Sequence, residues 1–113
     1  MASSAPRLER RRSQRLPIRI PVTLFATAFD GRAIEVLAEA IEVNQYGGLI
    51  RAPLSPGLGT GIELLNINTQ VLEEFRVIRI REERVDGLFE LGVEIMSMRR
   101  NFWGVPFPES TLA

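Results

Sequence analysis

Apolar and polar residues alternate along most of the chain with the period of two that is typical of β-strands. In the first such run, Ile18, Ile20, Val22 and Leu24 share one side, which predicts a strand with one buried face. Pro21 lies inside this run. Because proline has no N–H to donate to a ladder, it predicts that this strand lies at the edge of a sheet.

The segment 33–44 allows two interpretations. Its sequence AIEVLAEAIEV could form a helix with one apolar stripe. We favour a long strand, because the turn signal Asp30-Gly31 precedes it, its end is β-branched, and a lone helix fits poorly between hairpins. In a strand, the apolar positions change from even to odd numbers near residues 39–41. Such a change of phase predicts a β-bulge of the kind that helps barrels to close.

Four further strands are predicted by the same alternation and by the turn residues between the runs. They cover residues 49–50, 62–66, 71–81 and 89–95. Together the runs make about six strands with hairpin links. The sequence therefore predicts an all-β fold, a small closed antiparallel barrel of six strands.

The C-terminal segment FWGVPFP carries a large apolar load. Aromatic side chains in such number are seldom left in water, so we expect Phe102, Trp103 and Phe107 to plug one end of the barrel. The alternative is an exposed motif that binds a partner.

Composition narrows the class of function. The chain has 113 residues, of which 45% are hydrophobic, and it contains neither cysteine nor histidine. The missing residue types remove zinc sites of the Cys/His type, thiol nucleophiles and the imidazole base, so we expect neither an enzyme nor a bound cofactor or metal. Without a long apolar run, we expect a cytoplasmic protein that does not enter the membrane. One domain is expected over residues 10–108, after a disordered segment 1–9 and before a tail 109–113.

Charge is distributed unevenly, although the net charge is zero. Every basic side chain is an arginine, and six lie in the first nineteen residues: Arg7, Arg10, Arg11, Arg12, Arg15 and Arg19. The planar fork of arginine fits phosphates and the acceptor edge of guanine better than the point charge of lysine.

Two short motifs occur in a suggestive order. The pair Arg11 and Arg15 lies before the first predicted strand, and Glu42, Asn44 and Gly47 follow in the segment EVNQYGG. This arrangement resembles the PilZ domain family, whose signature is RxxxR followed by (D/N)xSxxG. In this chain glutamate takes the acidic position and asparagine takes the serine position. The resemblance covers residues 10 to 107 and implies a PilZ-like barrel that binds the bacterial second messenger cyclic di-GMP.

The resemblance also implies a role for the arginine-rich N-terminal arm. Arg11 and Arg15 would fork onto the phosphates or the O6/N7 edges of guanine, and Arg10 and Arg12 would add less specific attraction to phosphate. An arm that is flexible without the ligand would become ordered when it closes over the nucleotide.

On the barrel, the resemblance implies that Glu42, Asn44 and Gly47 complete the ligand site. Glu42 and Asn44 are two residues apart on a strand and so point to one face, where a carboxylate accepts from the N1 and N2 donors of guanine. Gly47 would permit a positive φ or a close approach of the backbone to the nucleotide.

Two other functions remain open. One is a PilZ-like barrel that has lost nucleotide binding and acts through protein contacts. The favoured receptor function would itself need a protein partner to pass on its signal. A nucleic-acid-binding barrel is the third possibility. We do not favour it, because the chain lacks the aromatic side chains interleaved with basic strands that stack on bases.

Overall fold

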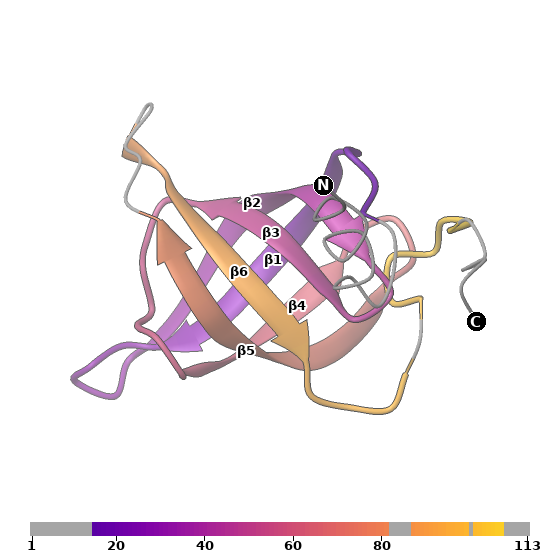
Figure 1. Ribbon diagram of the computed structural model, residues 1–113. Helices are drawn as coiled ribbons and strands as arrows, with labels where there is room; N and C mark the ends of the chain where they lie inside the picture. Colours follow the sequence, from indigo (N-terminus) through magenta and orange to yellow (C-terminus); the bar gives the residue numbers. More distant parts are fainter. Residues whose placement is uncertain (1–14, 82–86, 100, 108–113) are drawn as a thin grey trace, which may run out of the picture.

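Six antiparallel strands close into a barrel in the computed structural model, which describes residues 15–81, 87–99 and 101–107 (Figure 1). The strands are β1 (Ile20–Thr27), β2 (Ala33–Asn44), β3 (Gly47–Ala52), β4 (Gly61–Asn66), β5 (Val71–Arg81) and β6 (Phe89–Ile95). Their order around the barrel is β1-β2-β3-β6-β5-β4, and the pairing of β4 with β1 closes the ring. The prediction of an all-β fold with a closed six-stranded barrel is confirmed.

Strand β2 settles the ambiguity of its segment in favour of the strand. Residues 33–40 of β2 pair with β1 and residues 39–44 pair with β3, so strand ladders supply partners for its backbone groups. The register shifts between Ala40 and Glu42, which confirms the predicted bulge. Gly31 has a φ of 90° in the turn before β2, a conformation that glycine adopts without steric cost.

The prediction that Pro21 marks an edge strand is wrong, because β1 pairs with β2 on one side and with β4 on the other. The proline is tolerated for a local reason. The β1–β4 ladder begins at Val22, and the oxygen of Pro21 accepts from Ile67 N beyond the end of β4. N and O of one strand residue point to the same side. The nitrogen of Pro21 therefore points towards β4, beyond the last residue pair of the β1–β4 ladder, where no N–H is needed.

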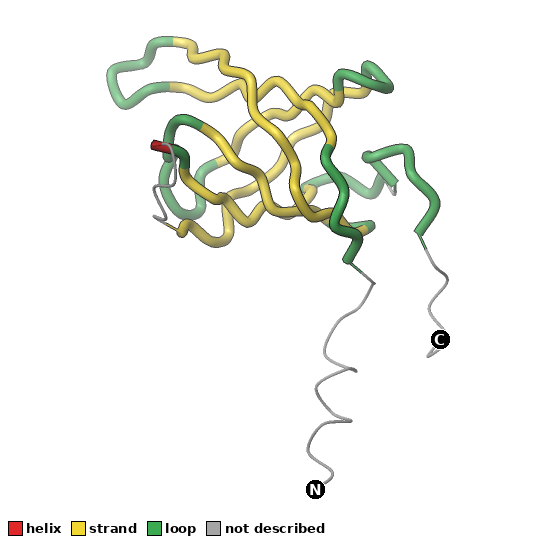
Figure 2. The backbone as a smooth tube through the Cα atoms, turned by 90° about the horizontal axis from the view of Figure 1, so that it is seen from above, coloured by secondary structure: helices red, strands yellow, loops and turns green. Residues whose placement is uncertain are grey.

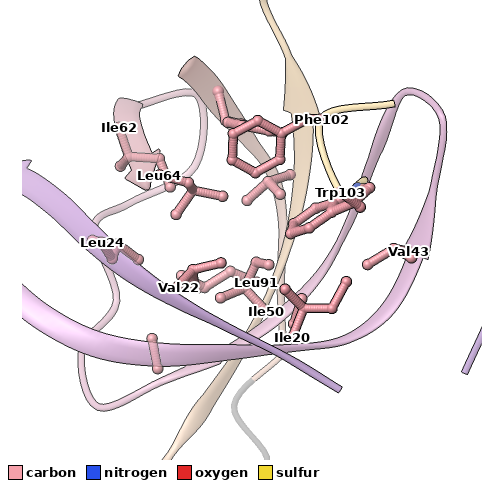
Figure 3. Packing of buried hydrophobic residues seen from close by; sticks show 14 of the residues in the cluster. Ile20, Val22, Leu24, Val43, Ile50, Ile62, Leu64, Leu91, Phe102 and Trp103 are labelled. Atoms are coloured by element: carbon pink, nitrogen blue, oxygen red, sulfur yellow. The ribbon is translucent and has the colours of Figure 1, made fainter. Parts of the chain in front are cut away.

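The core lies inside the barrel and is built from the inward-facing residues of all six strands (Figure 3). Buried hydrophobic side chains from the strands are Ile20, Val22, Leu24, Ala40, Val43, Ile50, Ala52, Ile62, Leu64, Phe75, Val77, Leu91 and Val93. Each strand contributes alternate residues, apart from the phase changes at the bulges in β2 and β5.

The aromatic tail closes one end of this core, as predicted. Phe102 and Trp103 are almost fully buried, and their rings meet edge to face with centroids 4.9 Å apart (Figure 3). The fully buried Asn66 holds the segment in place, because its Nδ2 donates to the backbone oxygens of Phe102 and Trp103. Phe107 is partly buried against the same cluster.

The described parts of the two terminal segments lie at the same end of the barrel (Figure 2). Leu16 pairs with Val43 through two backbone hydrogen bonds, and Trp103 Nε1 donates to the oxygen of Gly47. Both contacts are made beside the β2–β3 turn. No helix in the described part of the chain is long and apolar enough to span a bilayer.

Candidate functional site

A shallow pocket of about 120 Å³ lies on the outer face of the barrel, over strands β2, β3, β6 and β5. Cross-strand pairing places Glu42 opposite Leu49, Leu49 opposite Gly92, and Gly92 opposite Arg79. This row of four residues, here called the pocket row, runs around the barrel and forms the floor and walls. The pocket is lined by Arg15, Glu42, Val43, Asn44, Gly48, Leu49, Ile78, Arg79, Gly92 and Val93.

Gly92 makes the surface hollow at this place. It is the member of the pocket row without a side chain, and it lies between the side chains of Leu49 and Arg79. A Cβ atom at this position would lie 3.1 Å from Arg79 Cβ. A larger side chain would therefore fill the space over β6.

Arg15 lies at the rim and forms an ion pair with Glu42, with 3.2 Å between its Nη1 and Oε1 of the glutamate. The backbone of the next residue, Leu16, is fixed by two hydrogen bonds with Val43 of 2.8 and 3.0 Å. The two charged side chains remain 37% and 35% exposed. Because a guanidinium carries five N–H donors, the contact with Glu42 leaves most of them available to a ligand.

Asn44 shapes the turn that follows β2. Its Oδ1 accepts hydrogen bonds from the backbone N–H groups of Tyr46 and Gly47, at 2.7 and 2.9 Å. This is an Asx turn, in which the side chain satisfies backbone donors two and three residues later. The oxygen is thus engaged within the protein, and the Nδ2 group of Asn44 is the part that can meet a ligand.

Gly47 has a different role from the one expected. It does not belong to the residues with positive φ, and it does not line the pocket. A Cβ at Gly47 would lie 1.9 Å from the backbone oxygen of Val93. Glycine is therefore required because β3 approaches β6 closely here, whereas the expectation was an approach of the backbone to a nucleotide.

The acidic residues on both sides of the pocket row are paired with arginines other than Arg79. On one side, Glu90 lies 3.1 Å from Arg51 and 3.7 Å from Arg81. On the other side, Arg76 and Glu94 are 3.8 Å apart. Within the described part of the chain Arg79 has no acidic partner, so its positive charge is available to an anion at the pocket.

Three of the site residues predicted from the sequence come together at this pocket: Arg15, Glu42 and Asn44. Arg10, Arg11 and Arg12 lie outside the described residues. Sequence reasoning missed Leu49, Arg79 and Gly92. A signal existed for Gly92, because an isolated glycine within a strand often marks a close approach of another group.

No protein-family model matches the sequence, and a search of curated proteins finds no significant match. Within residues 15–81, 87–99 and 101–107, no three acidic side chains gather in a way that could hold a metal ion.

Proposed function

We propose that the chain is a receptor module for cyclic di-GMP and that the nucleotide binds over the pocket row. The observation that carries this proposal is the convergence of Arg15, Glu42 and Asn44 beside a hollow whose far wall is Arg79, which has no acidic partner among the described residues. The PilZ resemblance supports the same ligand, because its two motifs contain the first three of these residues.

The chemistry of the ligand matches the side chains at the pocket. Cyclic di-GMP offers two phosphates and two guanines. Arg15 and Arg79 lie at different sides of Gly92 and can fork onto a phosphate or onto the O6/N7 edge of a guanine. Glu42 provides the acceptor for the N1 and N2 donors of guanine, after Arg15 exchanges its carboxylate partner for the ligand.

The size of the pocket constrains the mode of binding. Sites that enclose small ligands have volumes of about 300–1,000 Å³, well above the 120 Å³ found here. One guanine or one phosphate group would therefore enter the hollow over Gly92. The rest of the nucleotide would lie across the outer face.

A titration with cyclic di-GMP by calorimetry tests the proposal, with Arg15→Ala and Arg79→Ala beside the unaltered chain. We expect saturable binding by the unaltered chain. Each variant should bind about ten- to a hundredfold more weakly, because a hydrogen bond to a charged group contributes about 1.5–3 kcal/mol. The half-exposed Arg15–Glu42 pair contributes only about 0–1 kcal/mol to folding, so thermal unfolding should be almost unchanged.

Arg32→Ala is the matched control. Arg32 also forms an ion pair, with Asp30 at 3.0 Å, but it lies in the β1–β2 turn at the other end of the barrel. Its removal should leave the affinity unchanged. Absence of binding at about 1 mM nucleotide, or equal affinity of all four proteins, would contradict the proposal.

The second candidate function is a barrel that acts through protein contacts without a nucleotide. The observation in its favour is a set of leucines exposed on the outer surface, with Leu37 73% and Leu72 48% exposed. The titration distinguishes the two functions, because this candidate predicts no binding of cyclic di-GMP.

A further inference from the structure

The wall of the pocket over β5 is formed at a β-bulge. Val77 pairs with Val93 on β6. Arg79 pairs with Gly92, the next residue along that ladder, so Ile78 is the extra residue between two successive pairs. In a regular strand, alternation would turn Ile78 towards the core whenever Arg79 faces outward. The bulge instead brings both side chains to the pocket, which both of them line.

Ile78 is thus a large apolar side chain on the outer surface of the barrel. It is 51% exposed, whereas Phe75 and Val77 on the same strand are fully buried. A single exposed apolar residue is common on protein surfaces and indicates no function by itself. Ile78 differs from such a residue because it lies on a bulge and beside a hollow. Bulges often occur next to binding sites, where they redirect a side chain.

The space directly over Gly92 is surrounded by aliphatic groups. Leu49 on β3 pairs with Gly92 from one side, and Ile78 and Arg79 lie on the other side. The atom of Arg79 nearest to a Cβ built on Gly92 is its own Cβ, at 3.1 Å. Arginine commonly lays its aliphatic stem along apolar surface and keeps its charged group in water. The hollow therefore has aliphatic walls, and the charged groups lie at its edge.

We propose that the hollow over Gly92 receives the purine ring of the nucleotide, with Ile78 and Leu49 packed against the ring and the phosphates outside. This inference rests on the proposed function for the identity of the nucleotide, and it decides between the two groups that the pocket could admit. A purine ring is flat and has two apolar faces, so its contact with aliphatic side chains is favourable. A phosphate in the same place would lose its hydration against side chains that donate no hydrogen bond.

The polar groups at the edge of the hollow match the edges of a guanine in this position. Arg79 lies at the β5 end of the pocket row and Glu42 at the β2 end. Guanine carries the acceptors O6 and N7 on one edge, and its N1 and N2 groups are donors. A ring over Gly92 would meet the donors of Arg79 on one side and the acceptor of Glu42 on the other. Adenine lacks these donors, so cyclic di-AMP should bind more weakly than cyclic di-GMP.

Methyl NMR spectroscopy of the full chain locates the base directly. With isoleucine and leucine methyl groups labelled, we expect intermolecular NOEs from Ile78 and Leu49 to the H8 proton of guanine at saturating cyclic di-GMP. H8 is bound to carbon and observable in water, whereas the phosphates carry no such proton. A saturated complex without NOEs from these two residues to H8 would overturn the inference and leave the receptor function intact, because the base would lie elsewhere.

A matched pair of small probes separates this inference from the proposed function. GMP and ribose 5-phosphate carry the same sugar and phosphate, and only GMP carries a base. At about 10 mM of each probe, GMP should shift the methyl signals of Ile78 and Leu49, and ribose 5-phosphate should leave them unchanged. If GMP produces these shifts but cyclic di-GMP does not bind, the receptor function is wrong and the base site remains. Equal shifts with both probes, or no shift with either, would overturn the base site.

Ile78→Ser tests the contribution of the wall to affinity, with Leu72→Ser as the matched control. Leu72 also lies on β5 and is 48% exposed, but it does not line the pocket. Ile78→Ser should weaken the binding of cyclic di-GMP by about three- to tenfold, because about half of an isoleucine side chain loses its contact with the base. Leu72→Ser should bind like the unaltered chain. Circular dichroism melts would verify that both variants are folded, and equal affinity of Ile78→Ser and the unaltered chain would contradict the packing of Ile78 on the base.

Discussion

Trp103 connects the buried aromatic segment to the first residue of β3, and its replacement by phenylalanine should lower the free energy of unfolding. The indole ring is 2% exposed, and its Nε1 donates to the oxygen of Gly47 at 3.0 Å. Phenylalanine would keep part of the ring packing against Phe75 and Phe102. It would remove the hydrogen bond that the indole donates to the carbonyl of Gly47.

The magnitude follows from two contributions. The lost hydrogen bond costs about 0.5–1.5 kcal/mol, and the smaller ring leaves a gap that adds about 1 kcal/mol. Trp103→Phe should therefore lower the free energy of unfolding by about 1.5–2.5 kcal/mol. Domains are stable by about 5–15 kcal/mol, so the variant should remain folded. Trp103→Ala should cost more, because truncation of a buried aromatic residue costs about 3–5 kcal/mol through packing alone.

Urea unfolding followed by far-UV circular dichroism measures this difference. Intrinsic fluorescence is unsuitable, because Trp103 is the one tryptophan of the chain and the variants remove it. Phe29→Ala is the control, since Phe29 is fully exposed in the β1–β2 turn, and it should change the stability by no more than about 0.5 kcal/mol. A Trp103→Phe variant within about 0.5 kcal/mol of the unaltered chain would refute the reasoning.

Two further predictions concern the turn beside the pocket. Asn44→Ala should destabilise the barrel by about 1–2 kcal/mol, because two backbone N–H groups lose their acceptor. Asn44→Asp should keep most of the stability of the unaltered chain, because its carboxylate can accept the same two hydrogen bonds. Urea unfolding measures both variants, and equal stabilities of Asn44→Ala and Asn44→Asp would contradict the assigned role. Gly47→Ala should cost more than about 2 kcal/mol, because the new Cβ would collide with the backbone oxygen of Val93. A Cβ at Gly31 would contact nothing within 4 Å, so Gly31→Ala should cost about 1 kcal/mol through its positive φ alone. Equal losses of stability in Gly47→Ala and Gly31→Ala would show that the close approach of β3 to β6 does not cause the effect at Gly47.

Local patterns were sufficient for most strands. The alternation of Leu91 and Val93 with Glu90 and Gly92 predicted β6, because a side chain that faces the core differs in polarity from its neighbours along the strand. The bulge in β2 was also readable, since it shifts the phase of the apolar positions. The edge strand predicted from Pro21 was wrong, because the missing N–H of a proline shows where one ladder ends and does not show whether another strand lies beside it.

The candidate site was predicted in part. Glu42 and Asn44 were expected from the resemblance to the PilZ motif, and their spacing in one strand placed them on the same face. The structure brings Arg15 to them through the backbone pairing of Leu16 with Val43. Arg79 was not predicted, because it follows Glu42 by about forty residues in the sequence and has the pattern of any exposed arginine on a strand.

What the sequence by itself determined is the set of strands, their turns and the aromatic segment that had to be buried, because each depends on the polarity of neighbouring residues. Only the tertiary structure decided which strands meet. The closing pairing of Val22 with Asn66 and the meeting of Glu42, Leu49, Gly92 and Arg79 over one hollow depend on the register of the closed barrel. Register in a closed barrel couples residues far apart along the chain, whereas the local pattern of polar and apolar residues fixes only which side of each strand faces the core.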